Sequence, residues 1–323
     1  MWLQVRLYLL VALLFSILYG LIVGVAYLFG YSGFTFYIMV FGLAFALIFI
    51  QFLIGPKIVE WSMRVRYINE NEYPNIHKMV EELSQKAGLP NKPKVGIAEI
   101  KIPNAFAFGR TKKDARVCVT RGILDILNED ELKAVLGHEI SHIQHRDVVI
   151  ITMLSVIPMI CYMLYITLFW GGMGRRGRDS GGAMAIGFLA LAIYFITSLL
   201  VLYGSRIREY YADKGSVELG CKPNDLATAL YKFTLVSAKT PKKLLKQAEG
   251  MKAFLLNDPS NAINEVRELK DIDVDMSGTI DSYELQMLTN KKIKLTTADR
   301  LMEVFSSHPN MKKRIKHLAT LSN

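Results

Sequence analysis

One short run of the sequence combines two histidines and a glutamate at a spacing that suits metal chemistry. The run is His138-Glu139-Ile140-Ser141-His142. Four positions along an α-helix turn through about 400°, so the two imidazole rings project from one face about 40° apart. Both rings can therefore bind one Zn²⁺, while Glu139 stands beside the open coordination position, where a general base is needed. The spacing predicts a catalytic zinc site.

A third protein ligand is needed, because catalytic zinc has three such ligands and one open position. His145 lies on the same face as His138, but the pattern that recruits a third histidine would place it near position 148, which is Val. His145 is therefore predicted to be a surface or outer residue. Glu209 and Asp213 are again four residues apart and share a helical face. Glu209 can complete a His₂Glu set, and Asp213 can accept the outer N–H of a ligating histidine. The alternative is a charged helix start at a membrane surface.

A second metal motif lies nearer the C-terminus, where residues 273–284 match the 12-residue EF-hand loop. In that loop, positions 1, 3, 5, 9 and 12 offer side-chain oxygens, position 7 offers its carbonyl, and position 6 is the glycine of a sharp turn. The apolar residues that flank it at helical spacing are Ile263, Val266, Leu269, Leu285 and Leu288. EF-hands usually pair and a second loop is not found, so weak affinity and a structural role are expected, with a merely acidic turn as the alternative. The calcium ligands are Asp273, Asp275, Ser277, Thr279, Asp281 and Glu284, with Gly278 at the turn.

Four apolar segments must position these groups, and none of them contains Asp, Glu, Lys or Arg. They are 7–30, 33–54, 148–170 and 184–204. Each is roughly 20 residues or longer, enough for a helix to cross a hydrocarbon core about 30 Å thick. With 51% hydrophobic and 21% charged residues, the chain is not an ordinary soluble enzyme. The third and fourth segments make two crossings, so Glu209 returns to the side that His138 left, and this hairpin closes the metal site.

The chain is predicted to alternate membrane hairpins with two parts of one soluble domain. The hairpins are 1–54 and 148–204, and the first is expected to be a retained anchor. The soluble parts are 55–147, with the zinc helix, and 205–323, with the third ligand and a calcium-loop insertion at 262–292. Within them the patterns predict helices at 73–88, 129–147, 222–256 and 296–321 and strands at 94–101 and 116–119.

The charge balance bears on partners and on orientation. Lys and Arg number 39 against 29 Asp and Glu, a net charge of +10. Basic residues beside membrane segments keep loops on the cytoplasmic side and meet anionic lipid, and a nucleic-acid recognition motif is not found. Three scattered cysteines give no disulfide framework, which fits a reducing compartment. However, Arg175, Arg176 and Arg178 join the third and fourth segments, so either this basic loop lies opposite the soluble domain or those two segments enter the membrane incompletely.

Four motifs together resemble the HtpX-type membrane zinc metalloproteases, gluzincins related to the CAAX prenyl proteases. They are Asn104–Ala107, Ala134–Asp147, Arg206–Asp213 and Ser307–Pro309. The resemblance implies zinc bound by His138, His142 and Glu209, with Glu139 taking the proton of the attacking water. It also implies an edge strand, formed by Asn104, Ala105, Phe106 and Ala107, that pairs with an extended peptide. His308 is its candidate oxyanion donor, with Arg206, an outer residue of the site, and Tyr210 as the other candidates; His308 as a helix-start residue is the alternative.

The expected protein is mainly α-helical, with four transmembrane helices and a cytoplasmic α+β protease domain of zincin type that carries a small edge-exposed sheet. We expect a zinc endopeptidase of the cell (inner or plasma) membrane, with one Zn²⁺ and a possible Ca²⁺. Polypeptides, chiefly misfolded or surplus membrane proteins, and the lipid bilayer are its expected partners in quality control and stress response, without nucleic acid. A site-2-type intramembrane protease fits less well, because its motif lies inside a span. A CAAX protease has more spans, and an inactive calcium-responsive scaffold conflicts with the intact motif.

Overall fold

The computed structural model describes residues 34–173, 180–240, 272–290 and 296–322, together with 9, 12–14, 16–23, 266 and 269. The predicted basic loop with Arg175, Arg176 and Arg178 lies outside these residues, as does the predicted helical stretch after residue 240. The chain divides into two compact units. One comprises Met1–Ile54 with Val149–Gly204, and the other comprises Gly55–Val148 with Ser205–Asn323.

The first unit is built from long apolar helices. It contains most of α2 (Phe34–Ser62) and α6 (Asp147–Met173) and the first part of α7 (Ser180–Glu218). Leucines of the helical stretch 16–23 pack against Leu154, Ile157 and Ala190. Among the described residues, one helix is long and apolar enough to cross a membrane, Met184–Glu218, and only 17% of its most apolar window is buried. A core helix of a soluble protein would be mostly buried, so this helix has the surface of a membrane helix.

The four predicted transmembrane helices are not all established. Beside Met184–Glu218, the described residues contain two shorter apolar helices, Ala12–Val23 and Ile157–Phe169. Many side chains on the apolar parts of α6 and α7 are nevertheless exposed and large, and these include Tyr162, Met163, Phe188, Leu189, Phe195 and Ile196. Such a concentration of exposed apolar surface is typical of contact with lipid.

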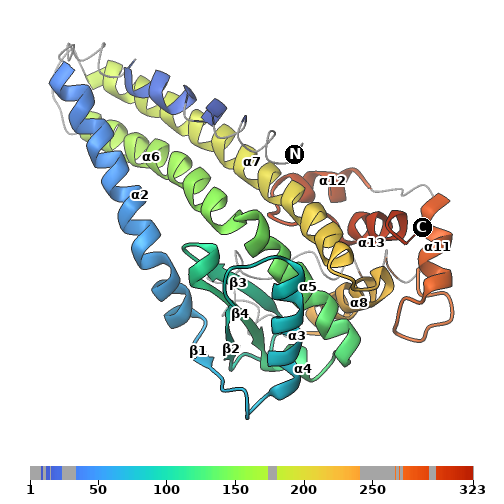
Figure 1. Ribbon diagram of the computed structural model, residues 1–323. Coiled ribbons are helices and arrows are strands. Elements are labelled where there is room, and N and C mark those ends of the chain that lie inside the picture. Colours follow the sequence, from blue (N-terminus) through green and yellow to red (C-terminus); the bar gives the residue numbers. More distant parts are fainter. Residues whose placement is uncertain are drawn as a thin grey trace. The chain divides into compact units, whose positions relative to one another are not determined.

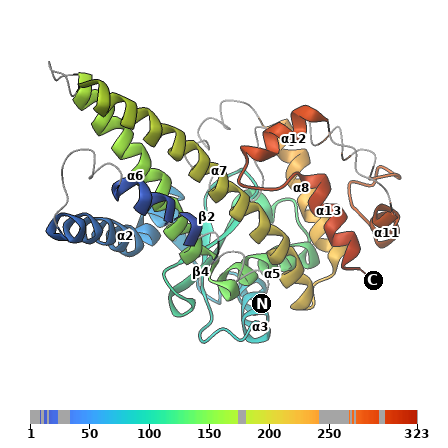
Figure 2. The same cartoon turned by 90° about the horizontal axis from the view of Figure 1, so that it is seen from above.

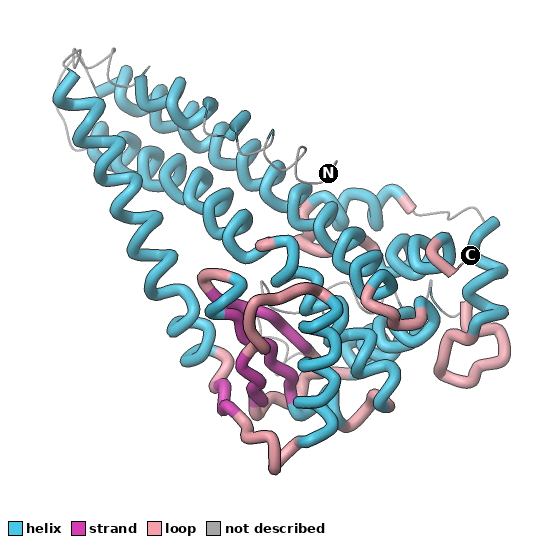
Figure 3. The backbone as a smooth tube through the Cα atoms, in the orientation of Figure 1, coloured by secondary structure: helices cyan, strands magenta, loops and turns pink. Residues whose placement is uncertain are grey.

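The second unit contains a small mixed sheet, drawn in magenta in Figure 3. Its strands are β1 (Val65–Tyr67), β2 (Lys94–Ala98), β3 (Ala105–Gly109) and β4 (Ala115–Thr120), in the spatial order β1-β2-β4-β3. Strands β2 and β4 run parallel, and the two outer strands pair antiparallel with them. Strand β3 is therefore an edge of the described sheet, which is the position predicted for the segment that begins at Asn104.

The same unit contains several helices, some of which pack against the sheet. They are α3 (Pro74–Lys86), α4 (Arg121–Leu124), α5 (Glu129–His145), α8 (Pro223–Lys239), α11 (Ser282–Asn290), α12 (Thr297–Val304) and α13 (Met311–Thr320). Helix α5 packs against α3, α8 and the strands β3 and β4, and α8 lies beside α13 (Figures 1 and 2). Helix α5 begins at a capping box, in which the Asn128 side chain accepts a hydrogen bond from the backbone N–H of Glu131. The Glu131 side chain in turn accepts one from the backbone N–H of Asn128.

Three sequence predictions need correction. The helix predicted over 129–147 does not run straight into the third apolar segment, because Arg146 is left-handed with a φ of 60° and separates α5 from α6. The helix predicted over 296–321 is two helices, α12 and α13. The short strand β1 was not predicted at all, since three residues are too few to show an alternating pattern.

Candidate metal centre

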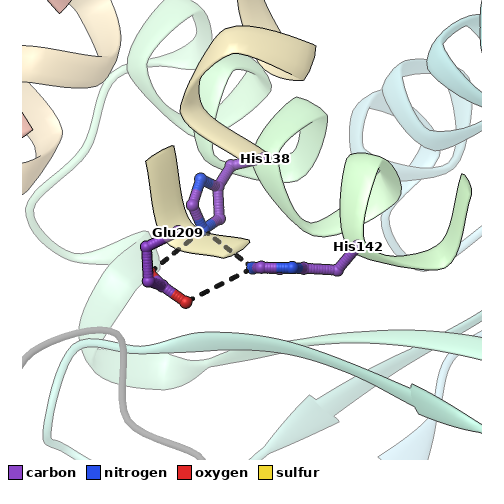
Figure 4. Close-up of side chains that lie close together, drawn as sticks. All are labelled: His138, His142 and Glu209. Atoms are coloured by element: carbon purple, nitrogen blue, oxygen red, sulfur yellow. Dashed lines mark hydrogen bonds and ion pairs between the residues drawn. The ribbon is translucent and has the colours of Figure 1, made fainter. Parts of the chain in front are cut away.

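The two histidines of α5 and Glu209 of α7 meet at one point inside the second unit (Figure 4). The Nε2 atoms of His138 and His142 are 3.1 Å apart. Glu209 Oε2 lies 3.6 Å from His138 Nε2, and Glu209 Oε1 lies 3.6 Å from His142 Nε2. A tetrahedral zinc with bonds of 2.0–2.1 Å separates its ligand atoms by roughly 3.3 Å. The donor types and their spacing therefore fit a zinc ion.

A carboxylate lies against the outer nitrogen of each histidine. His138 Nδ1 is 2.9 Å from Asp213 Oδ1, and His142 Nδ1 is 2.7 Å from Asp147 Oδ2. Such contacts place the proton on Nδ1 and leave Nε2 free to bind a metal. Asp213 stands where the sequence pattern predicted it, whereas Asp147 was missed. Its contact depends on the break at Arg146, which starts a new helix at Asp147.

Arg314 of α13 is, beside Asp147, a second charged residue of this centre that sequence reasoning missed. Its side chain is fully buried. Its Nη1 lies 3.0 Å from Glu209 Oε2, and its Nε and Nη2 donate to the two oxygens of Asp213 at 3.0 and 2.6 Å. One guanidinium therefore connects Glu209, a predicted zinc ligand, to the carboxylate of Asp213 beside His138, another predicted ligand. The sequence contained a signal for a buried charge, because Arg314 lies on the apolar face of its helix with Met311, Ile315 and Leu318.

The electrostatics of this cluster favour a cation at its centre. Burial alone would raise the pKa of Glu209, but His308 and Arg314 hold it well below its usual range. Burial likewise acts to raise the pKa of Asp213, and the Arg314 charge lowers it overall. Burial lowers the pKa of His138, yet its hydrogen bonds to Asp213 and Glu209 raise it to about 9. Both carboxylates are thus charged at neutral pH, and they attract positive charge.

Two glycines allow α5 to approach the last part of α7 closely enough to form the site. A Cβ at Gly137 would lie 2.9 Å from Ser216 Oγ, and a Cβ at Gly215 would lie 2.0 Å from Ser141 Oγ. Ser216 Oγ also donates to the carbonyl of Ala134 at 2.7 Å. These close contacts between α5 and α7 determine how near Glu209 comes to the two histidines.

Glu139, beside His138 on α5, is 3% exposed. In the part of the chain that the structure describes, a hydrogen-bond donor or cationic partner for its carboxylate is not found. A buried carboxylate without such a partner keeps both oxygens available for another molecule, as a general base requires.

Comparison with known proteins assigns the family. The family described as Peptidase family M48 matches residues 70–322. A protease HtpX homolog of Methanothermobacter thermautotrophicus is 52% identical over 233 residues, covering 72% of this chain and 86% of the relative. One from Aeropyrum pernix is 32% identical over 299 residues, covering 91% and 89%. This chain belongs to peptidase family M48. It is a membrane metalloendopeptidase, as predicted from its motifs.

A solved structure shows the same fold at low identity. The M48 chain resembles the crystal structure of S. mikatae Ste24p, with a TM-score of 0.50 and 17% sequence identity. The match covers 97% of this chain and 67% of that chain. The M48 family is zinc-dependent, in agreement with the donor set of His138, His142 and Glu209.

His308 of this M48 chain lies against the ligand carboxylate. Its Nδ1 is 3.3 Å from Glu209 Oε2, and its buried Nε2 makes no hydrogen bond to any described residue. Arg206 holds the segment before it, because Arg206 Nη1 donates to the carbonyls of Glu303, Val304 and Ser306 at 2.7 to 3.0 Å. Arg206 therefore holds in place the chain segment that precedes His308.

The other residues that the sequence singled out, which include Tyr210 and His145, contact groups outside the set of His138, His142 and Glu209. The ring of Tyr210 packs edge-on against His317, with centroids 5.2 Å apart. His145 Nδ1 lies 2.8 Å from the carbonyl oxygen of Ser141 on its own helix. Asp273, Asp275 and Glu284, three of the predicted calcium ligands, bring carboxylate oxygens within 4.8 Å of one another in a second cluster.

Proposed function

We propose that this M48 chain hydrolyses peptide bonds with a zinc ion held by His138 Nε2, His142 Nε2 and Glu209. The observation that supports this most strongly is the set of ligand separations of 3.1 and 3.6 Å, combined with a carboxylate on each outer histidine nitrogen. When bound, zinc supplies Lewis acidity, which polarises the peptide carbonyl and lowers the pKa of water to about 7.

The side chains around the ion would carry the proton and stabilise charge. Glu139 accepts a proton from the attacking water and then donates it to the leaving amine, as a general base and acid. His308 donates from a ring nitrogen to the oxygen on which negative charge develops. The free Nε2 of His308 supports this role. Arg314 and Asp213 keep Glu209 and His138 in place, and Arg206 keeps the segment before His308 in place.

Strand β3 is the proposed binding surface for substrate. It is an edge strand of the described sheet, and it packs against α5, the helix with both histidines. An extended peptide can add to such an edge through main-chain hydrogen bonds. Asn104 is held at its start, because Asn104 N donates to Thr120 Oγ1 at 2.8 Å and its carbonyl accepts from Thr120 N at 2.9 Å. Recognition of main-chain groups favours unfolded segments of many sequences.

We infer that the chain crosses the membrane four times, with the sheet-containing unit in the cytoplasm, and that it removes misfolded or surplus membrane proteins. The exposed apolar side chains of α6 and α7 support membrane insertion, and the net charge of +10 supports the cytoplasmic side. The zinc residues belong to the unit that contains the sheet, which disfavours a site-2-type reaction inside the bilayer. The complete His-His-Glu group disfavours an inactive scaffold.

The decisive experiment compares wild type with Glu139→Gln in cleavage of casein by the detergent-purified chain, with zinc supplied. We expect the variant to keep its zinc and to lose at least about 100-fold in rate, because removal of the general base raises the barrier. Glu218→Gln, on the exposed end of α7, is the matched control and should cleave normally. Equal cleavage by wild type and Glu139→Gln would refute the assigned base, and a zinc-loaded but inactive wild type would favour a scaffold.

The side of the membrane needs its own test. A cysteine introduced at exposed Lys113 gives one accessible thiol, because all three native cysteines are buried. In intact cells a membrane-impermeant maleimide should leave this thiol unlabelled, and permeabilised cells should label it. Labelling of intact cells would place the peptidase unit outside.

A further inference from the structure

The segment 273–284 forms a tight loop that leads into α11. Gly278, at the sixth position of the sequence pattern, has a φ of +79°, the left-handed conformation that this position requires. The predicted apolar flanks Leu269, Leu285 and Leu288 are buried, whereas Ile263 lies outside the described residues. The loop is seen beside α11 in Figure 3. Sequence pattern and backbone therefore agree at the position where a sharp turn is needed.

The carboxylates of the loop turn inward and are held by backbone N–H groups. Ser277 N donates to one oxygen of Asp273 and one of Asp275, each at 2.9 Å. Val274 N and Asp281 N donate to the two oxygens of Glu284 at 2.6 and 3.1 Å. Asp273, Asp275 and Glu284 thus bring oxygens within 4.8 Å of one another from both ends of the loop.

Two of the loop carboxylates are buried, and a cationic side chain that pairs with them is not found in the described part of the chain. Asp273 and Glu284 are each only 5% exposed. Among the residues that the structure describes, a Lys, Arg or His ion pair with any carboxylate of the loop is not found. Buried carboxylates carry a large desolvation cost unless they are paired with opposite charge or bind a metal. The backbone N–H groups and the Tyr231 hydroxyl that contact these carboxylates supply only partial charges, so a bound cation would compensate the buried negative charge.

The chemistry of the oxygens selects the ion. All the candidate ligands are carboxylate, hydroxyl or carbonyl oxygens, which suit hard cations, whereas zinc sites use nitrogen and sulfur far more. The number of ligands available in this twelve-residue pattern suits Ca²⁺, which takes six to eight oxygens, better than the smaller octahedral Mg²⁺.

Two side chains of α8 fasten the loop to the peptidase unit. Ile280 N donates to Thr228 Oγ1 at 2.9 Å, and Thr228 Oγ1 donates to the Ile280 carbonyl at 3.1 Å. The hydroxyl of Tyr231 donates to Asp273 Oδ2 at 3.0 Å. Both main-chain groups of Ile280 are thereby satisfied by α8, which docks the loop on the peptidase unit.

We propose that residues 273–284 bind one Ca²⁺ through Asp273, Asp275, Ser277, Asp281, Glu284 and the carbonyl of Thr279, and that the ion fixes α11 against α13. Glu284 lies in the first turn of α11, so an ion that joins it to Asp273 fixes where this helix starts. Helix α11 in turn packs against α13, and Thr289 Oγ1 donates to the Ala319 carbonyl at 3.3 Å. Helix α13 holds Arg314. This inference does not depend on the peptidase reaction.

Direct calcium binding tests the proposal in the full-length, zinc-loaded chain in detergent. After removal of calcium, titration calorimetry should show one Ca²⁺ per chain, with a Kd between about 10⁻⁶ and 10⁻³ M. Glu284→Gln should weaken binding at least about 100-fold, since it removes the bidentate ligand. The control Glu218→Gln, the same chemical change on exposed α7, should bind like wild type.

A second variant controls for the misfolding that Glu284→Gln could cause. Asp275 is exposed, so Asp275→Asn should fold, keep its zinc and still bind calcium more weakly. Hydrogen exchange should slow in α11 and α13 of wild type when calcium is added, and remain unchanged in Asp275→Asn. Failure of zinc-loaded wild type to bind at about 10 mM Ca²⁺, equal affinity in Asp275→Asn, or equally tight binding of Mg²⁺ would each overturn the assignment.

Discussion

The two carboxylate clusters of the peptidase unit balance their charge in different ways. At the zinc centre, Glu209 and Asp213 share the buried guanidinium of Arg314, and histidines lie on their other sides. At the calcium loop, Asp273 and Glu284 are as deeply buried but are held by backbone N–H and hydroxyl groups. The first cluster has the cationic side chain of Arg314 beside its metal position, whereas an ion pair with the second is not found among the described residues.

This difference predicts different behaviour without metal. The zinc centre is joined by ion pairs between protein side chains, so we expect its geometry to survive removal of the ion. In the described part of the chain a cationic side chain paired with the carboxylates of the calcium loop is not found, so we expect the order of the loop to depend on the ion. Substitution of Arg314 should therefore destabilise the zinc centre, and removal of calcium should destabilise the calcium loop.

The largest effect is expected from Arg314→Met, which leaves two buried carboxylates without their cation. Breaking a buried ion pair on one side costs about 3–5 kcal/mol, a large fraction of the stability of a typical domain. We expect a marked fall in the unfolding temperature and loss of zinc, measured by thermal unfolding and metal analysis.

Arg314→Lys sharpens this result. Lysine restores one positive charge but cannot form the fork that contacts Asp213 through two nitrogens. It should recover part of the stability while zinc content stays below wild type. Wild-type stability and zinc content in Arg314→Met would contradict the role assigned to the guanidinium.

The next largest effect is expected from calcium removal. With free Ca²⁺ at about 100 times Kd, binding stabilises the folded state by about 2.7 kcal/mol. Chelation at fixed free zinc should therefore lower the unfolding temperature and the rate of casein cleavage, because α11 and α13 loosen near Arg314. Glu284→Gln should start low and show no further loss on chelation. Equal cleavage rates of wild type with calcium and with chelator would refute the coupling between the two clusters.

Gly215→Ala tests how closely the zinc centre is packed. The added Cβ would meet Ser141 Oγ at 2.0 Å, and overpacking of this kind costs about 1–3 kcal/mol. Because the clash separates α7 from α5, zinc affinity should fall together with the unfolding temperature. Gly181→Ala is the matched control on the same helix, since its Cβ would have no atom within 4 Å. Similar effects of the two substitutions would show that close approach is not what positions Glu209.

Much of the zinc centre was predictable because its signals are local. His138 and His142 are one helical turn apart, and Glu209 and Asp213 repeat this spacing, so four residues could be grouped from two short motifs. The edge strand after Asn104 was predicted from resemblance, and the family itself is confirmed. The spacing within each motif required no knowledge of helix packing, whereas the hairpin and the family resemblance were needed to join Glu209 to the histidines.

The remaining parts depend on long-range packing. Arg314 meets Asp213 across 101 positions of sequence, and only the packing of α13 creates that contact. Asp147 meets His142 because Arg146 adopts a left-handed conformation, which an arginine does not signal. The docking of Ile280 on Thr228 likewise joins positions 52 residues apart. Spacing within one helix therefore reveals ligands, whereas the groups that orient them come from other helices.

The smallest effect is expected from Met276→Asn, which tests the calcium loop alone. Met276 has a φ of 58°, and this left-handed conformation costs a non-glycine residue roughly 1–2 kcal/mol, less for asparagine. Its side chain is 88% exposed, so the substitution removes little packing. Asparagine should relieve part of the strain and raise calcium affinity by up to about 5-fold, since a 1 kcal/mol gain corresponds to that factor. Val274→Asn, exposed and without a positive φ, should leave affinity unchanged. The same affinity change in both variants would attribute the effect to polarity. A gain confined to position 276 would show that backbone strain limits ion binding in the loop, whereas the zinc centre is positioned by ion pairs between side chains.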